Sequence, residues 1–243
     1  MQQLIAQLDC PITGDVETFL AAAKRLKSAG AFHLHDPGGG LSPLALGSLL
    51  QEELGKEIYL HLHPADRNRA ALFSELITAN AVGLEKIVLG AGQHPAKTLL
   101  KEAKPVFDLD LLQLLRMALY TKSGFDPAGR SMKGEVFLQI GVLAKVDSPL
   151  ELFRLRQMVD MGADYVFLKW PSKLLILAQL PKEIGKPTYL SLALEEARGF
   201  REEDWGELKA SAVAGINLRI PGGKEDEGEE VLRWYFHYLS SES

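Results

Sequence analysis

The chain alternates short apolar runs with longer segments in which apolar residues recur every three or four positions. A short apolar run between turn residues predicts a buried strand, and the wider spacing predicts an amphipathic helix. Regular alternation of the two is typical of a parallel sheet covered by helices. The predicted strands are Leu4–Leu8, Phe32–His35, Ile58–Leu62, Ile87–Leu89, Val136–Leu143, Tyr165–Leu168, Thr188–Leu192 and Gly215–Arg219.

The segments between these strands carry helix signals. Gly14–Gly30 has apolar residues at helical spacing and ends on glycine, and Asp147–Ala163 begins with Asp-Ser-Pro. Eight strand–helix units without a linker-like break predict one domain over residues 1–243, a single (β/α)8 TIM barrel in the α/β class. An open doubly wound sheet is the alternative, but no Gly-x-Gly-x-x-Gly fingerprint follows the first strand.

The composition of the chain limits the kinds of partner and the cellular location that we expect for it. The chain is 47% hydrophobic and has a formal net charge of −5. This composition gives no sign of the basic surface that nucleic-acid binding requires. Cys10 is the single cysteine, which excludes a disulfide within the chain and favours a cytoplasmic location. The first residues do not resemble a signal peptide, and no apolar run reaches the length of a membrane span.

Polar side chains gather at the predicted strand ends, which form the active face of a TIM barrel. Five of the six histidines, at positions 33, 35, 61, 63 and 94, lie at or just after strands two, three and four. Residues two apart on a strand share a face, so each His-x-His pair and the pair Gln7 and Asp9 point the same way. Asp36, Gln93 and Lys169 complete a predicted polar mouth. The His-x-His pairs, with Asp9 or Asp36, also fit a metal site as an alternative.

These residues lie in segments that resemble the methylenetetrahydrofolate reductases, which are flavin-dependent (β/α)8 barrels. The resemblance is carried by "HLHPADRNRAALFSELITANAVGLEKIVLGAGQHP", "KPVFDLDLLQLLRMA", "LRQMVDMGADYVFLKWP" and "AQLDCPITGDVETFLAAAKRLKSAGA". It spans nearly the whole chain. His61, which corresponds to a flavin neighbour in that family, is retained together with Asp66, Arg67 and Asn68.

The departures from the family pattern fall where its chemistry takes place. Gln7 stands where the family has the glutamate that protonates the methylene bridge, and Gln93 replaces an aspartate that contacts folate and flavin. Lys169 replaces a folate-binding glutamine, and His63 replaces a threonine. The resemblance therefore implies a folate barrel with altered chemistry.

Three functions follow from this resemblance. The first is methyl transfer at N5 of tetrahydrofolate or methyltetrahydrofolate, without flavin, to or from a corrinoid on a partner protein. The second is flavin-dependent reduction with FAD, in which Asp9 replaces the missing acid. The third is a non-catalytic folate-binding relative. A metal-dependent hydrolase or lyase built on the histidine pairs is a further alternative, and homo-oligomerisation is a family-level expectation.

The predicted roles divide nine residues into two groups. The catalytic residues are Gln7, Asp9 and His61, and the substrate-binding residues are His35, Asp36, His63, Gln93, Gln139 and Lys169. No residue is assigned to a metal in this prediction.

Overall fold

The computed structural model describes residues 2–98, 100–170 and 175–240 of the chain. Within these residues, eight parallel strands close into a barrel in sequence order, and the first strand pairs with the last. The predicted (β/α)8 barrel is therefore confirmed. The strands are β1 (Gln3–Asp9), β2 (Ala31–His35), β3 (Glu57–Leu62), β4 (Lys86–Leu89), β5 (Gln139–Ala144), β6 (Tyr165–Lys169), β7 (Thr188–Ala193) and β8 (Gly215–Arg219).

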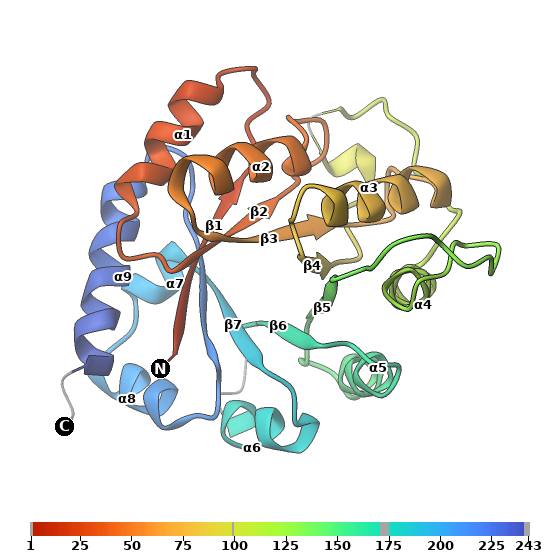
Figure 1. Cartoon of the computed structure of the whole chain (residues 1–243). Coiled ribbons are helices and arrows are strands. Elements are labelled where there is room, and N and C mark those ends of the chain that lie inside the picture. Colours follow the sequence, from red (N-terminus) through yellow and green to blue (C-terminus); the bar gives the residue numbers. More distant parts are fainter. Residues whose placement is uncertain (1, 99, 171–174, 241–243) are drawn as a thin grey trace.

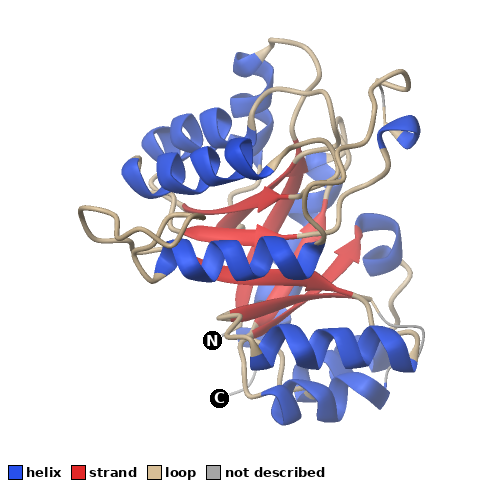
Figure 2. Cartoon of the chain, turned by 90° about the vertical axis from the view of Figure 1, so that its right-hand side faces the viewer, coloured by secondary structure: helices blue, strands red, loops and turns tan. Residues whose placement is uncertain are grey.

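Helices surround the strands on the outside of the barrel (Figures 1 and 2). Two helices, α7 and α8, separate β7 from β8, and a short 3-10 turn, η1 (Pro95–Lys97), follows β4. The α-helices are α1 (Val16–Arg25), α2 (Pro43–Leu54), α3 (Arg69–Ala81), α4 (Leu111–Lys122), α5 (Pro149–Asp160), α6 (Leu175–Ile184), α7 (Leu194–Arg198), α8 (Glu202–Ala210) and α9 (Glu225–Ser240).

Side-chain caps fix where the helices nearest the mouth begin. The Asn68 side chain accepts a hydrogen bond from the backbone N–H of Ala71 at the start of α3. At the start of α5, Ser148 Oγ accepts from the N–H of Glu151, and Glu151 Oε2 accepts from the N–H of Ser148. Such a reciprocal capping box satisfies two backbone donors that the first helical turn leaves unpaired. The predicted Asp-Ser-Pro helix start is confirmed.

The core has two parts. Leucines, isoleucines and other aliphatic side chains fill the space between the barrel and its helices. Inside the barrel, aromatic rings from β3, β6 and β7 pack together, namely Tyr59, Tyr165, Phe167 and Tyr189. Gly141 makes room for them, since a Cβ there would lie 2.0 Å from the Tyr165 ring. These rings fill the middle of the barrel.

The prediction for Gln139 is wrong. The fifth strand begins at Gln139, three residues later than predicted, because Val136 and Phe137 precede the strand and Phe137 is exposed. Gln139 pairs with Lys86, which is the first residue of β4. It therefore lies at the amino-terminal end of the barrel, opposite the mouth, and is not a substrate-binding residue there.

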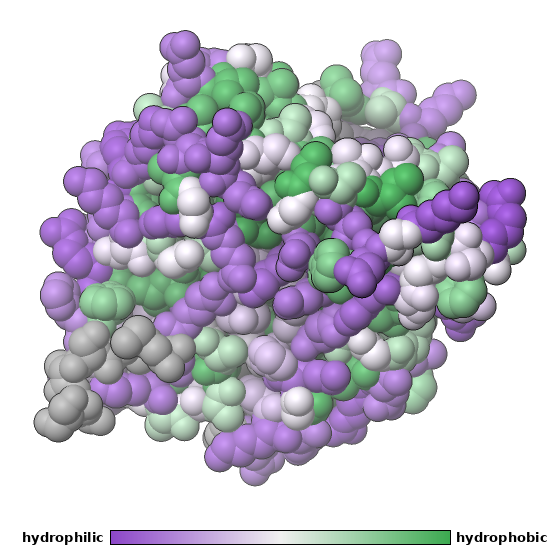
Figure 3. All heavy atoms as spheres, viewed as in Figure 1, coloured by the Kyte–Doolittle hydropathy of each residue, from purple (hydrophilic) through white to green (hydrophobic). Residues whose placement is uncertain are grey.

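The outer surface is mixed in polarity. Figure 3 shows hydrophilic residues over most of one face, interrupted by smaller hydrophobic patches. Among the described residues, we find no helix with both the length and the apolar character needed to span a bilayer.

Candidate active site

A cavity of about 540 Å³ lies at the carboxyl ends of the strands. This volume falls within the roughly 300–1,000 Å³ that small-molecule sites occupy. Six of the nine predicted site residues line it, which are His35, Asp36, His61, His63, Gln93 and Lys169. The polar mouth predicted from the strand ends is thus a real cavity, in the place where TIM barrels carry their active sites.

Gln7, on β1, is not among the residues that line the cavity. Its side chain is 8% exposed, and its Oε1 accepts a hydrogen bond of 2.9 Å from Nδ2 of Asn217 on β8. The same amide nitrogen lies 2.6 Å from Ser191 Oγ on β7. Gln7 therefore joins a neutral hydrogen-bonded group that links β1, β7 and β8.

Asp9 is held by two partners at the end of β1. Its Oδ1 lies 2.8 Å from Nδ1 of His35, and its Oδ2 accepts a hydrogen bond of 2.8 Å from Arg219. Burial raises the pKa of the Asp9 carboxyl, but the hydrogen bonds from His35 and Arg219 outweigh burial, so the pKa is lowered. Asp9 is an ionised carboxylate at neutral pH and a poor proton donor.

Histidine rings cluster at the cavity, which His35, His61 and His63 line. The His61 ring stacks on His35 with centroids 4.8 Å apart, and it meets the edges of His33 and His63 at 5.7 and 5.9 Å. Gly90 leaves room for it, since a Cβ there would lie 2.3 Å from His61 Nε2. Neither ring nitrogen of His33 or His61 has a hydrogen-bond partner among the described residues.

Burial keeps the two deepest histidines neutral. It lowers the pKa of His33 to about 3, and the neighbouring His35 adds to the effect. Burial also lowers the pKa of His61 well below its ordinary value, with further contributions from the surrounding histidines. Both rings are therefore neutral imidazoles at physiological pH.

Arg67 organises the carboxylates on one side of the mouth. It pairs with Asp36, and its Nε lies 3.2 Å from Glu75 and 4.0 Å from Asp66. Burial raises the pKa of Glu75; Arg67 opposes this effect, and the charges of Asp36 and Asp66 add to it. Asp66 and Arg67, shortly after β3, thus belong to a charged network that also includes Asp36 and Glu75.

A group of cations, here called the cationic wall, lies at the ends of β5 and β6, across the eight-stranded barrel from the ends of β1 and β2. The term covers Lys145, which follows β5, Arg154 on α5 and Lys169 at the end of β6, while the acidic Glu151 of α5 also lines the cavity. Burial lowers the pKa of Lys169, and the nearby charges of Lys145 and Arg219 lower it further. The sequence patterns identified Lys169 but missed Lys145 and Arg154, although Lys145 lies two residues after the end of a predicted strand and could have been found by that signal.

Comparisons with known proteins bear on the fold. No protein-family model matches the chain, and no curated protein matches it. The tryptophan synthase complex from Pyrococcus furiosus contains a similar chain, with 16% identity, a TM-score of 0.61 and coverage of 98% of this chain and 96% of that one. Monomers of phosphoribosylanthranilate isomerase from Thermotoga maritima match with 11% identity, a TM-score of 0.57 and complete coverage of both chains.

Orotidine 5′-monophosphate decarboxylase from Methanocaldococcus jannaschii is similar at 9% identity and a TM-score of 0.56, over 97% of this chain and 98% of that chain. At such identities the likeness extends to the fold alone, because TIM barrels host many unrelated activities. The chain has the architecture of the TIM-barrel enzymes.

Proposed function

We propose that this protein binds a reduced folate in the mouth cavity and transfers a methyl group at folate N5, with a corrinoid on a partner protein as the other substrate. The observation that carries the proposal is the lining of the cavity, which combines imidazole and amide side chains with several cations. His35 ends β2 and Lys169 ends β6, and these two strands lie across the eight-stranded barrel from one another. The resemblance to methylenetetrahydrofolate reductases supplies the substrate class.

A reduced folate has parts that suit both kinds of side chain. Its pterin is a neutral bicyclic ring system edged with hydrogen-bond donors and acceptors, and its glutamate tail carries carboxylates. The imidazole and amide side chains suit the pterin, because buried polar edges need paired partners. Lys145, Arg154 and Lys169 suit the carboxylates through charge-assisted hydrogen bonds.

Methyl transfer also fits the protonation states at the mouth. Tetrahydrofolate N5 attacks the methyl group of a methylated corrinoid, the cobalt–carbon bond breaks, and cobalt keeps the electron pair. N5 then gives its proton to solvent. This step needs no general acid, whereas reduction of the methylene bridge does. Asp9, the proposed substitute acid of a reductase, is held ionised by His35 and Arg219, which favours methyl transfer over reduction.

Binding of a folate and of its tailless analogue tests the substrate class. We expect calorimetry to show binding of tetrahydrofolate, and to show a weaker interaction with a tetrahydropterin that lacks the benzoylglutamate. The double variant Lys145→Ala/Lys169→Ala should weaken folate binding about tenfold or more and leave binding of the tailless pterin unchanged. The matched control is Lys133→Ala/Lys182→Ala, which removes the same charge outside the cavity lining. Absence of binding by any reduced folate would refute the proposal.

An activity assay separates methyl transfer from the reductase alternative. The purified protein is mixed with tetrahydrofolate and methylcobalamin, and loss of the methyl–cobalt absorbance is followed. A parallel assay with FAD and a reduced nicotinamide tests reduction of methylenetetrahydrofolate. Folate binding with neither activity would favour the non-catalytic relative, and reduction alone would favour the reductase.

A further inference from the structure

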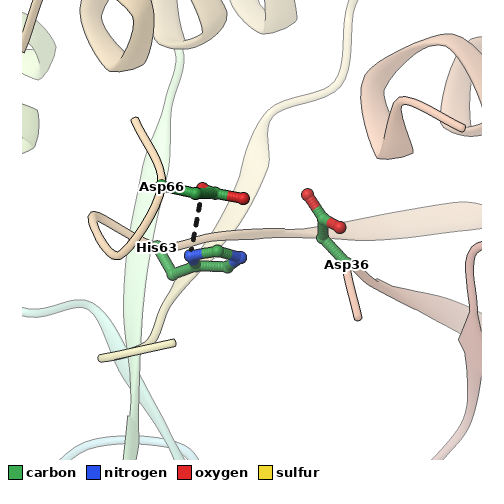
Figure 4. Close-up of side chains that lie close together, drawn as sticks. All are labelled: Asp36, His63 and Asp66. Carbon is green, nitrogen blue, oxygen red and sulfur yellow. Dashed lines mark ion pairs between the residues drawn. The ribbon is translucent and has the colours of Figure 1, made fainter. Parts of the chain in front are cut away.

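We infer that Asp36, His63 and Asp66 form a binding site for one divalent transition-metal ion at the edge of the mouth cavity. Each residue offers one ligand atom, and the three atoms lie within 4.8 Å of one another. Figure 4 shows Asp66 over the His63 ring, with the carboxylate of Asp36 on the neighbouring strand end turned toward them. All three residues line the cavity. The inference is independent of the proposed folate chemistry.

The first observation in support of a metal site concerns the buried side chain of His63. Its side chain is about 5% exposed, and Nδ1 has no hydrogen-bond partner among the described residues. The nearest acidic atom, Oδ1 of Asp66, is 3.5 Å away and also has no such partner. This separation exceeds the roughly 2.7–3.2 Å of an N–H···O hydrogen bond. Two ligand atoms that each lie about 2.0–2.2 Å from one tetrahedral metal are roughly 3.4 Å apart, and the observed separation agrees with this value.

The second observation concerns the space that Gly92 leaves beside His63. It follows β4, and a Cβ at this position would lie 2.6 Å from Nδ1 of His63. Its backbone has a φ of +72°, which also favours glycine. The missing side chain leaves space beside a buried nitrogen that makes no hydrogen bond to a described residue.

The local charge suits a divalent cation. Asp36, Asp66 and Glu75 surround a single guanidinium, that of Arg67, which leaves a formal excess of two negative charges. Arg67 binds Oδ2 of Asp36. Oδ1 of Asp36 accepts one hydrogen bond of 2.8 Å, from Gly38 N–H, and retains a second lone pair for a metal.

The ligand set indicates the class of metal. One imidazole with two carboxylates suits Zn²⁺, Mn²⁺ or Fe²⁺, whereas Mg²⁺ prefers oxygen ligands alone. Three protein ligands leave a coordination position open to the cavity, as in catalytic rather than structural metal sites. That position can take a water molecule or a donor atom of a substrate.

Zn²⁺ titration of the chelator-treated protein, without folate or corrinoid, tests the site. Calorimetry should show one Zn²⁺ per chain for the wild type, and Co²⁺ in its place should give visible d–d absorption. His63→Ala and Asp66→Asn should each weaken Zn²⁺ binding by at least the roughly 10–100-fold that loss of an outer-shell partner costs. His237→Ala, which removes an exposed histidine of α9, is the matched control and should bind like the wild type.

Two outcomes would overturn the inference. One is the absence of stoichiometric binding of Zn²⁺, Mn²⁺ and Co²⁺ by the wild type, in which case the carboxylates serve only to hold Arg67. The other is undiminished Zn²⁺ affinity in both site variants with unchanged circular dichroism. Asp66 is partly exposed, so Asp66→Asn gives a test that does not depend on a core substitution. Failure of folate binding would leave this titration unaffected, so the two proposals fail separately.

Discussion

Gln7 shows how a single position constrains the chemistry of the mouth. Its amide is nearly buried and accepts a hydrogen bond from Asn217. A carboxylate can accept the same bond, but it would carry a charge into a site largely removed from water, and burial would raise its pKa. The position therefore suits a neutral group, unlike the acid of the reductase pattern.

We expect Gln7→Glu to lower the free energy of unfolding at pH 7 by about 1–3 kcal/mol, the cost of an ill-satisfied buried polar group. Methyl transfer should be slower or unchanged, and flavin-linked reduction should not appear. Chemical denaturation and the two activity assays measure these effects, with Gln7→Leu as the uncharged control. Nicotinamide-dependent reduction that rises in Gln7→Glu would reverse the order of the two proposed functions.

His33 makes stability depend on pH. It is fully buried beside His61, His35, Asn217 and Phe167, and Asp9 is the charged group that favours its protonation. Its pKa is lowered to about 3 in the folded protein, whereas an unfolded histidine has a pKa of about 6.5. As the pH falls through this window, the unfolded chain takes up a proton that folded His33 does not, so stability decreases.

The expected slope from His33 alone is about 1.4 kcal/mol per pH unit between pH 6 and 4. We expect His33→Leu to show a smaller decrease in unfolding free energy over this range than the wild type. Urea denaturation at several pH values measures it, and His237→Leu, on the exposed face of α9, should leave the slope unchanged. Equal slopes in wild type and His33→Leu would show that His33 can be protonated in the folded state.

Gly90 sets the position of the His61 ring. A methyl group at this position would overlap Nε2 of His61, which is 2% exposed and packed among other rings. We therefore expect Gly90→Ala to displace His61 and to weaken folate binding about tenfold or more, as measured by calorimetry. Gly14→Ala is the control, because a Cβ there meets nothing within 4 Å. Unchanged folate affinity in Gly90→Ala would mean that the His61 ring does not contact the ligand.

At the scale of the element, α5 connects the fold to the cationic wall. It begins at the Ser148–Glu151 capping box and carries Arg154 and Met158 into the cavity lining. The cap fixes the start of the helix and thereby the height of Arg154 above the barrel.

We expect Ser148→Ala to lower the free energy of unfolding by about 0.5–2 kcal/mol, the usual cost of removing an N-cap side chain. Thermal denaturation measures this change, and Ser148→Asp is the matched control because aspartate caps equally well. Folate affinity should decrease in Ser148→Ala and stay near the wild-type value in Ser148→Asp. Equal stability of the two variants would show that the backbone alone determines where α5 begins.

At the scale of the whole molecule, the barrel could be predicted from the sequence because strands buried on both faces appear as short apolar runs. The polar residues of the mouth could be predicted for the same reason. The strands β2 and β3 end at His35 and Leu62, which are at or next to the predicted site residues. Gln139 was misplaced because Val136 and Phe137 are apolar without being part of the strand. Arg154 was missed because its orientation depends on how α5 packs against the barrel, which periodicity does not determine.

Closure of the barrel depends on the contact between its first and last strands. Gly215 begins β8 and pairs with Gln3 of β1. A Cβ at Gly215 would lie 2.0 Å from the carbonyl oxygen of Gln3, which is backbone and has little freedom to move. The close approach of β1 and β8 therefore requires glycine here, although its backbone φ is not in the left-handed region.

We expect Gly215→Ala to push β1 and β8 apart and to lower the free energy of unfolding by about 1–3 kcal/mol or more, the usual cost of overpacking. Amide hydrogen exchange should show the loss of protection concentrated in β1 and β8, because their shared hydrogen bonds close the sheet. Gly222→Ala, just after β8, is the matched control, since a Cβ there meets nothing within 4 Å. Wild-type stability and exchange in Gly215→Ala would mean that the barrel closes with more space between its first and last strands than this packing allows.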